Sequence, residues 1–555
     1  MMRLFRYAPA ALALLGTVAA CDNGLEADNE NNPDRETVLR KPTDVEGLSS
    51  SLYQQILNAT LGNIARTETG MMTASFMNAS GLANNGLGPR SGIPRGQIDN
   101  GRGNPYATEN LADFRIHSQV ARSASDIFAR IQADENFTLG SAAQDTRLFA
   151  WTHFNYGVAL GNLALVYDSA AIPRPEDDPE APPPELVDHP EVMEAALTEL
   201  DSAIFYASKP EASLAGGFPT PSGGGWMNGT ALSAATFIRL ARSYKARFRA
   251  GVARTPTERA AVNWNTVIAD ATNGITANVN VNMDPANGWD YAWLSTTLHF
   301  RDANWHQMTP YIIGMADTSG AYDAWLATSR DSRTPFLIRT PDLRFPAGET
   351  RAAQNLAGQG APTGRRYFRN RAPGGDQSVV GWQSSFYDHY RWRAFADAGR
   401  IGSFPVFTVA ENDMLAAEGY IRTGNFASAA ALIDKTRTTS GLPSVAGITS
   451  ATQPVPGGDA CVPRVPVGPS FTTTACGTIL EAMKWEKRME TAYTSYGAWF
   501  FDARGWGDMP EGTALEWPVP FQELDARISE LYNLGGVGGQ AAAGPSTYGF
   551  GSGSR

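Results

Sequence analysis

A pair of helical patterns joined by a two-residue turn constrains the fold of this 555-residue chain more than any other feature. Apolar residues recur at helical spacing over residues 409–423 and again over 426–438, with only Gly424 and Asn425 between them. So short a connection makes two helices pack as antiparallel neighbours. Both segments carry alanines that allow the helix axes to approach closely: Ala416, Ala417, Ala429 and Ala430. The sequence therefore predicts a helical hairpin here.

Helical patterns recur along the rest of the chain. Thr255 and Thr408 each precede a glutamate by three residues, which is the spacing of a capping box at a helix start. We predict further helices from Thr43 to about residue 57 and over about 110–132, 142–168, 190–207, 231–251, 256–273 and 477–496. The segments 231–251 and 256–273 form a second candidate hairpin. A hairpin of about 34 residues is the unit of a tetratricopeptide repeat. The strict repeat signature is absent, so the prediction is a mainly α fold of repeat-like hairpins.

Two long stretches, residues 69–108 and about 275–405, lack this periodicity. They are rich in Trp, Tyr, Gly, Pro and Arg, so we expect long ordered loops with short helices and strands. Loops of this length in a compact protein usually carry function. Because 43% of the residues are apolar and 18% are charged, a well-buried core is expected, in one large domain over residues 36–532. The Gly-rich tail, 533–555, is expected to be loosely held.

The N-terminus has the three parts of a secretory signal peptide, which we place at residues 1–20. Arg3 and Arg6 precede an apolar run over residues 8–20 that ends in small residues directly before Cys21. This ending resembles the bacterial lipobox, in which the cysteine receives a lipid and becomes the mature N-terminus. The alternative is an unmodified signal peptide with a cysteine nearby. Residues 21–35 are acidic and polar, so they predict a flexible tether.

The two remaining cysteines, Cys461 and Cys476, lie in a stretch rich in Pro, Gly and Thr. In an oxidising compartment they are expected to form a disulfide, which would contribute about 3 kcal/mol by loop closure. The alternative is two unrelated free thiols.

Charge and motifs exclude several classes of protein. A net charge of -11 argues against a nucleic-acid binder, which needs a basic face. The sequence contains no P-loop, no G-x-S-x-G and no H-E-x-x-H, and we expect no cofactor and no metal. His299 and His306 lie near Asp302, where loop polar contacts are a simpler interpretation than a metal or acid–base site.

Aromatic clusters in the loop regions are the best candidates for a ligand site. Apolar ring faces suit sugar rings, and each stacked ring contributes on the order of 1 kcal/mol, so three or four rings give roughly millimolar affinity. The alternative is that the rings pack the loops onto the helices. One cluster is Trp382, Phe386, Tyr387, Tyr390 and Trp392. The residues chosen as ligand candidates are Tyr106, Trp289, Tyr291, Trp293, Trp305, Trp382 and Tyr387.

Several segments resemble a known family. The lipobox cysteine followed by PTDVEGL (residues 42–48) looks like the start of a SusD/RagB-family lipoprotein. ENDMLAAEGYIRTG (411–424) and AAALIDKTRTTSGLP (429–443) are similar to the family's helix pair. ILEAMKWEKRMETAYTSYGAWFFDARGW (479–506) is similar to its "ER…EL…EG.RWFDLRRW" segment, and WPVP (517–520) followed by Glu523 resembles "PIP..E". The departures from the family pattern are Asp434, Tyr496, Ala498 and Gly505.

The resemblance implies a fold and a function. The fold is a SusD-like helical domain, with repeat-like hairpins as scaffold and loops that carry the ligand face. The function is that of a lipid-anchored outer-membrane protein, facing the cell exterior, that captures a glycan or another oligomer for a SusC-like TonB-dependent transporter without catalysis. The motif residues are expected to be structural, with an ion-pair network between the helix near 486–490 and Arg504. They are Glu418, Arg437, Glu486, Arg488, Glu490, Trp499, Asp502, Arg504 and Trp506.

Two rival functions remain open. A secreted, lipid-anchored glycoside hydrolase would use a pair of facing carboxyl groups about 5 to 9.5 Å apart, which sequence alone cannot identify. A purely structural repeat scaffold would need no ligand.

Overall fold

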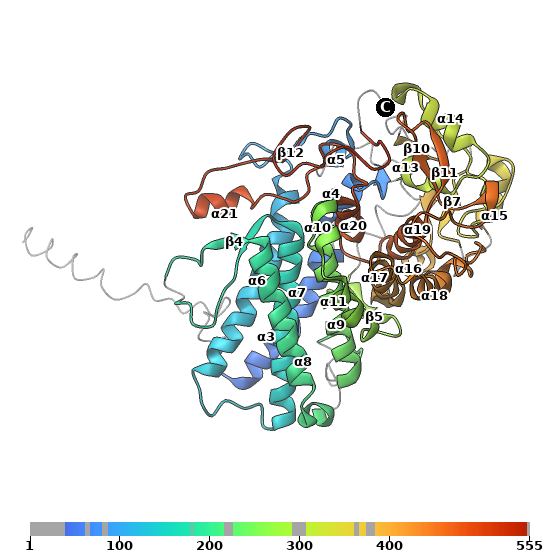
Figure 1. Ribbon diagram of the computed structural model, residues 1–555. Helices are drawn as coiled ribbons and strands as arrows, with labels where there is room; N and C mark the ends of the chain where they lie inside the picture. The colour runs from blue at the N-terminus through green and yellow to red at the C-terminus, as the bar shows by residue number, and fades with distance from the viewer. Residues whose placement is uncertain are drawn as a thin grey trace, which may run out of the picture.

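The computed structural model describes residues 39–61, 67–79, 87–178, 181–215, 226–290, 307–359, 366–372 and 383–551. Helices dominate it, so the predicted mainly α fold is confirmed. The helices of the scaffold are α3 (Pro42–Leu61), α6 (Ala107–Gln132), α7 (Ala142–Val166), α8 (His189–Ala207), α9 (Ala234–Gly251), α11 (Trp264–Thr272), α17 (Val409–Arg422), α18 (Phe426–Arg437) and α19 (Ile479–Thr491). Each packs against the next in chain order, and α19 packs against both α17 and α18. Figure 1 shows α3, α6, α7 and α8 lying side by side. None of the helices in the described part of the chain is long and apolar enough to cross a membrane.

Both predicted hairpins are present. The Thr408 hydroxyl accepts a hydrogen bond from Glu411 N (3.2 Å) at the start of α17, as the capping spacing predicts. Gly424 takes a positive φ of 80° in the turn, and α18 then packs along α17. In the second hairpin α9 packs against α11.

Two predicted helices are interrupted. The segment 256–273 is two helices, α10 (Pro256–Ala261) and α11, because the side chain of Asn263 caps a new helix by accepting from Thr266 N. The segment 477–496 stops at Thr491, where α19 ends. Tyr493 and Gly497 then adopt positive φ values of 61° and 57°, and α20 (Ala498–Trp506) begins in a new direction.

The centre of the scaffold is α7, which is buried along almost its whole length. Gly157 and Gly161 make this possible. A Cβ on Gly157 would lie 2.9 Å from Ala196 O of α8, and a Cβ on Gly161 would lie 2.1 Å from the Phe248 ring of α9. The two glycines therefore set how closely α8 and α9 approach α7.

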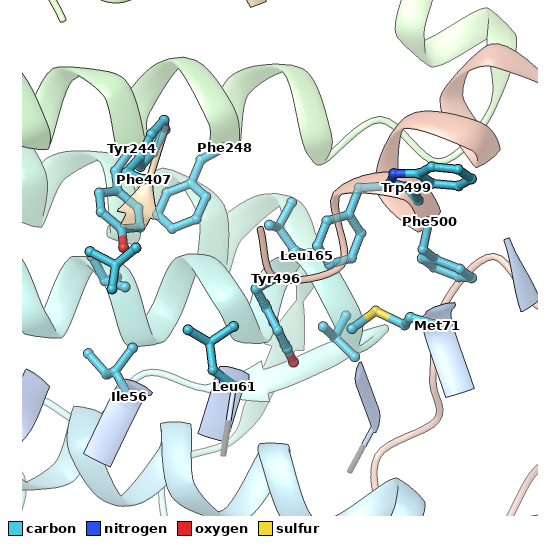
Figure 2. Packing of buried hydrophobic residues seen from close by; sticks show 14 of the residues in the cluster. Ile56, Leu61, Met71, Leu165, Tyr244, Phe248, Phe407, Tyr496, Trp499 and Phe500 are labelled. Carbon is cyan, nitrogen blue, oxygen red and sulfur yellow. The ribbon is translucent and has the colours of Figure 1, made fainter. Parts of the chain in front are cut away.

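One hydrophobic core joins the scaffold to the segment after α19. Figure 2 shows side chains from α3, α7, α9 and α20 converging on one layer, where Tyr244 and Phe248 lie near Phe407. Tyr496, Trp499 and Phe500 extend the same layer towards Met71 of α4 (Thr67–Ala74). The motif aromatics therefore belong to the core.

The charged motif residues are braces between helices. Arg259, fully buried, donates to both Glu418 oxygens (3.0 and 2.5 Å) and to Asp502 (3.0 Å). Burial alone would raise the pKa of Glu418, but the adjacent Arg259 outweighs it and holds this pKa well below its usual range. Lys487 also pairs with Asp502 (2.8 Å). These charges tie α10, α17, α19 and α20 together.

A second set of buried charges holds the loop regions on α19. Arg344 donates to Asp342 (2.7 Å) and Glu486 (2.9 Å), and Glu490 accepts from Tyr367 (2.8 Å). The expectation that Arg504 joins this network is wrong. Its terminal nitrogens donate to the carbonyl oxygens of Leu515 (2.6 Å) and Gly251 (2.9 Å). Arg504 therefore anchors backbone between α9 and the segment after α20.

Short helices and strands occur in the described parts of the loop regions, as predicted, and others lie elsewhere in the chain. The short helices are α4, α5 (Leu87–Ser91), α13 (Pro310–Ile313), α14 (Ala321–Ala327), α15 (Arg351–Gln359), α16 (Arg393–Asp397) and α21 (Phe521–Ala526). The strands form antiparallel pairs: β1 (Asn78–Ala79) with β6 (Gln307–Met308), β2 (Gln97–Ile98) with β12 (Leu534–Gly535), β3 (Ser169–Ala171) with β4 (Leu186–Asp188), β5 (Val279–Met283) with β9 (Gly402–Phe407), β7 (Phe368–Asn370) with β8 (Tyr387–His389), and β10 (Arg464–Val467) with β11 (Thr473–Cys476).

The C-terminal segment is packed onto the body over residues 533–551, so the expectation of a loosely held tail is wrong. Its strand β12 pairs with β2, residue Leu534 opposite Ile98. Phe550 is buried, and its ring lies edge-on to Tyr311 with centroids 4.8 Å apart. The glycines of this segment supply turns between anchored residues, and they do not make it loose.

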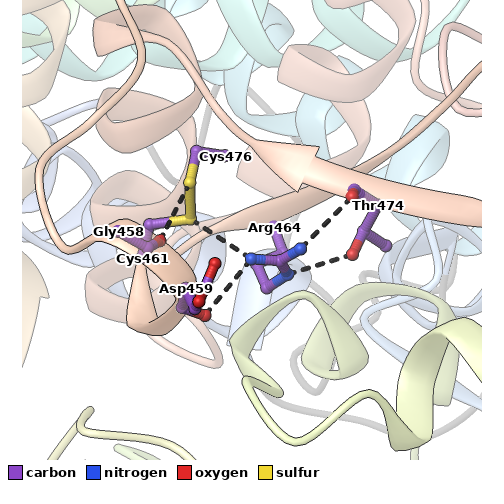
Figure 3. The surroundings of a disulfide bond; sticks show 6 residues. All are labelled: Gly458, Asp459, Cys461, Arg464, Thr474 and Cys476. Carbon is purple, nitrogen blue, oxygen red and sulfur yellow. Dashed lines mark hydrogen bonds between the residues drawn. A yellow bond between two sulfur atoms is a disulfide. The ribbon is translucent and has the colours of Figure 1, made fainter.

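Cys461 and Cys476 are joined as a disulfide, with Cα atoms 5.7 Å apart. Figure 3 shows the bond beside Arg464, which donates to Thr474 Oγ1 (3.1 Å) and to Asp459 O (3.2 Å). The disulfide closes the β10–β11 hairpin, and Cys461 packs into a hydrophobic cluster with α17, α18 and α19. Its role in the described structure is therefore to fix the insertion between α18 and α19.

Candidate ligand-binding face

The structure brings the two predicted loop regions together. Strand β1 from the first region pairs with β6 from the second, Asn78 opposite Met308 and Ala79 opposite Gln307. Strand β6 also contacts β8, which pairs with β7. We call these four strands the loop seam. The seam is therefore where described strands from both predicted loop regions meet.

Buried polar side chains hold the loop seam in place. The Gln307 side chain, 1% exposed, accepts from Ser385 N (2.9 Å) just before β8. Gln383 donates to Ser91 O at the end of α5 (2.5 Å). Thr73 of α4 donates to the Asn78 side-chain oxygen (3.0 Å). These bonds support the seam from α4 and α5, and loops that bind a ligand need a supported base of this kind.

Four of the aromatic ligand candidates lie outside the described residues: Tyr291, Trp293, Trp305 and Trp382. Two are close in the chain to described residues in or just before the seam strands. Trp305 is two residues before Gln307, and Trp382 directly precedes Gln383. Their assignment as ligand residues stays a prediction, and so does the position of His299 and His306, which are also outside the described residues.

Two candidates are core residues, which corrects the ligand assignment for them. Trp289 is 3% exposed, packs in the main hydrophobic core and exchanges backbone hydrogen bonds with Asp284 (2.8 and 3.1 Å). Tyr387 is fully buried; its hydroxyl donates to Gln354 Oε1 (2.6 Å) and accepts from Ile338 N (2.8 Å). Burial raises the pKa of Tyr387 to about 12. Protein atoms cover both rings, so neither offers a face to a ligand.

Tyr106 is half-buried at the N-terminal end of α6, where its backbone N donates to the Asn104 side chain (2.8 Å). Its ring is accessible enough to serve a ligand, and its role stays a prediction.

Three partly exposed rings flank the buried Tyr387, and two of them, Phe386 and Trp392, also pack against the core. Phe386, Tyr390 and Trp392 are each half-buried on either side of β8. Sequence reasoning treated the cluster as one patch, whereas burial of residues 387–389 separates core rings from surface rings. One signal in the sequence could have separated them: the polar residues Asp388 and His389 directly follow Tyr387. Polar residues between aromatic ones can be buried when they are paired, as Asp388 is with Arg371.

Two buried carboxyl groups, those of Glu68 and Asp113, bear on the hydrolase alternative. Glu68 and Asp113 influence one another, and burial followed by repulsion from Asp113 raises the pKa of Glu68 well above its usual value. Both are less than 2% exposed; Glu68 accepts from Gly497 N and Asp113 from the Tyr496 hydroxyl, each at 2.8 Å. They hold the turn before α20, where no substrate could reach them. Among the described residues, no three His, Cys, Asp or Glu side chains gather as a metal site would require.

Comparison with known proteins gives a fold. No family model matches the chain, and no curated protein matches it. Solved structures do: a SusD superfamily protein from Bacteroides vulgatus is similar over 88% of this chain and 97% of its own, with a TM-score of 0.55 and 13% identity. A SusD-like carbohydrate binding protein from Bacteroides fragilis is similar over 85% of this chain and 87% of its own (TM-score 0.51, 13% identity). A SusD homolog from Bacteroides thetaiotaomicron is similar over 90% of this chain and 98% of its own (TM-score 0.51, 11% identity). The SusD-like fold that the sequence predicts is therefore confirmed.

Proposed function

We propose, from its SusD-like fold, that this protein is a cell-surface lipoprotein that binds a glycan or another oligomeric nutrient. It is anchored in the outer membrane through a lipid on Cys21 and passes its ligand to a SusC-like TonB-dependent transporter. It carries out no chemistry on the ligand.

The observation that carries the proposal is the structural similarity over nearly the whole chain to a protein described as carbohydrate binding. Two features of this chain support it independently of that similarity. The sequence before Cys21 has the form of a lipobox, which lies outside the described residues. The loop seam joins strands from both aromatic-rich regions of the sequence, and aromatic faces suit sugar rings.

Direct binding tests the ligand class. The full chain, purified in detergent, is titrated calorimetrically with panels of oligosaccharides and of peptides. We expect a glycan to bind in the millimolar to micromolar range, with affinity reduced by Trp305→Ala or Trp382→Ala. The matched control is Phe205→Ala, which removes a ring that is 61% exposed on α8. No heat with any glycan or peptide would refute the proposal.

Lipid anchoring and the transporter partner have their own tests. Cells given labelled palmitate should label the wild-type protein and not Cys21→Ala, and the variant should leave the membrane fraction. An affinity-tagged wild-type chain should co-purify an outer-membrane barrel protein from its native host. Equal labelling of both chains would rule out Cys21 as the lipid site, and absence of a barrel would rule out a stable transporter complex.

A further inference from the structure

Arginine is concentrated in one part of an otherwise acidic chain. Residues 351–400 contain eight arginines, no lysine and three acidic residues, a local charge of +5 in a chain whose net charge is -11. Arginine differs from lysine in presenting a planar fork of N–H groups that matches a carboxylate, sulfate or phosphate. The composition of this stretch therefore favours recognition of a planar oxyanion.

The fold brings three of these arginines, Arg351, Arg369 and Arg371, to the β7–β8 side of the loop seam. Arg369 lies on β7 opposite Asp388 of β8, and Arg371 follows at the strand end, where it pairs with Asp388. Arg351 reaches the end of β7 from α15, because it donates to the carbonyl oxygens of Arg371 (3.2 Å) and Ala372 (3.1 Å).

Aromatic rings alternate with the arginines. The guanidinium carbon of Arg351 lies 4.2 Å from the centre of the Phe386 ring, and that of Arg369 lies 5.9 Å from the Tyr390 ring. Arg391 lies 4.8 Å from the Trp392 ring. Contact with a ring restrains the plane of a guanidinium, which lowers the entropy cost of binding an oxyanion. We call this set the arginine–aromatic ribbon: Arg351, Arg369, Phe386, Tyr390, Arg391 and Trp392.

Carboxylates balance some of this charge. Asp388 faces Arg371, and Asp397 faces Arg393. Glu490 pairs with Arg391 at 2.9 Å, although it is also 3.7 Å from Arg344. Asp290 pairs with Arg400 at 2.6 Å.

Counted along the sequence alone, the stretch carries eight arginines and three acidic residues, a surplus of five positive charges. On a chain that repels anions overall, a local surplus of this kind would favour the approach of an anionic ligand.

We infer that the ligand of this face is an anionic glycan, one whose sugar rings carry carboxylate or sulfate groups; the inference rests on the proposed function. The arginine–aromatic ribbon offers both components that such a ligand needs. Its half-buried rings suit the apolar faces of sugar rings, and its guanidinium groups suit the acidic substituents. A neutral glycan would use the rings alone.

The test compares three probes on the full chain in detergent. Oligogalacturonides supply carboxylates, chondroitin sulfate oligosaccharides supply sulfates as well, and xylo-oligosaccharides of matched length are neutral. The double variant Arg351→Gln/Arg369→Gln is compared with Arg102→Gln/Arg122→Gln, which removes the same charge from the loop before α6 and from α6 itself. A single-stranded oligonucleotide reports general binding of polyanions. Thermal melting confirms that each variant is folded.

We expect at least one anionic oligosaccharide to bind more tightly than the neutral one, with a Kd that rises several-fold between about 0.05 M and 0.5 M salt. The ribbon variant should weaken this binding about tenfold, since each charge-assisted hydrogen bond is worth more than a neutral one, and the control should leave it unchanged. Neutral glycan bound as tightly, or an unaffected ribbon variant, would overturn the inference and leave the proposed function standing. Equal affinity for the oligonucleotide would also overturn it, because charge alone would then suffice. Silence from all the glycans would overturn the proposed function as well.

Discussion

Removing the charge of Glu418 should destabilise the protein far more than removing an exposed charge. Glu418 and Arg259 are both fully buried and share two hydrogen bonds, at 3.0 and 2.5 Å. Glu418→Gln keeps the size of the side chain and its contact with Trp506. The only carboxylate left to Arg259 among its described ion pairs is then Asp502, which also pairs with Lys487. Breaking a buried ion pair by removing one partner costs about 3–5 kcal/mol.

The size of the effect can be bounded from the surroundings. Arg259 also donates to Ala250 O (2.5 Å), so the guanidinium keeps some of its hydrogen bonds. The bond from Arg422, which is 21% exposed, adds little because water screens it. We therefore expect a loss near the lower bound, about 3 kcal/mol.

Urea unfolding, followed by tryptophan fluorescence, measures this loss as a lower midpoint. Arg102→Gln, which breaks an exposed pair with Asp525, is the control and should match wild type. Arg259→Met/Glu418→Leu should be more stable than Glu418→Gln, since removing both charges leaves no stranded guanidinium. A loss below 1 kcal/mol for Glu418→Gln, or a double variant worse than the single, would refute the account of this brace.

Three further predictions concern the scaffold and are read from the same urea assay. Cys461→Ser/Cys476→Ser should cost about 3 kcal/mol, because the disulfide joins residues 15 apart in the chain; an unchanged midpoint would show that the pairing is not stabilising. Burial raises the pKa of Glu109 to about 7, so above about pH 4.5 the native state binds more protons than the unfolded state. The free energy of unfolding should therefore fall by on the order of 3 kcal/mol as the pH rises to 7. Glu109→Gln should flatten that slope, and an identical slope in both proteins would contradict the assignment. Gly161→Ala should cost about 1–3 kcal/mol, since its Cβ would lie 2.1 Å from a ring of α9, whereas Gly47→Ala, with nothing within 4 Å, should cost nothing; similar midpoints for the two would argue against close packing of α7.

Features encoded within a few residues could be predicted from the sequence. The spacing of Thr408 and Glu411 marks the start of α17 because a hydroxyl can reach a backbone N–H only three residues away. The same reasoning located α10 at Thr255, whose hydroxyl accepts from Glu258 N (3.2 Å). It missed the break after α10, since the apolar spacing continues across Asn263 although its side chain starts a new helix.

Contacts between distant segments could not be predicted this way. Strand β2 pairs with β12 more than 400 residues later in the chain, and only two residues of each take part. Pairs so short leave no alternating pattern in the sequence. The glycines of the C-terminal segment therefore indicated looseness, although Phe550 and the β12 pairing fix that segment to the body.

The ligand face shows the same limit in the choice of aromatic residues. Tyr387 and Tyr390 are three residues apart and chemically identical, yet one is buried and the other half-exposed. The difference arises because Tyr387 lies on β8. This strand is covered by α15 and β6, which come from other parts of the sequence. Aromatic composition can therefore suggest a candidate region, but it cannot separate buried rings from accessible ones. Charge is a second signal in the sequence here, because eight arginines stand against three acidic residues between residues 351 and 400. The inferred anionic ligand follows from that excess of arginine, whereas the aromatic residues alone would suit a neutral glycan equally well.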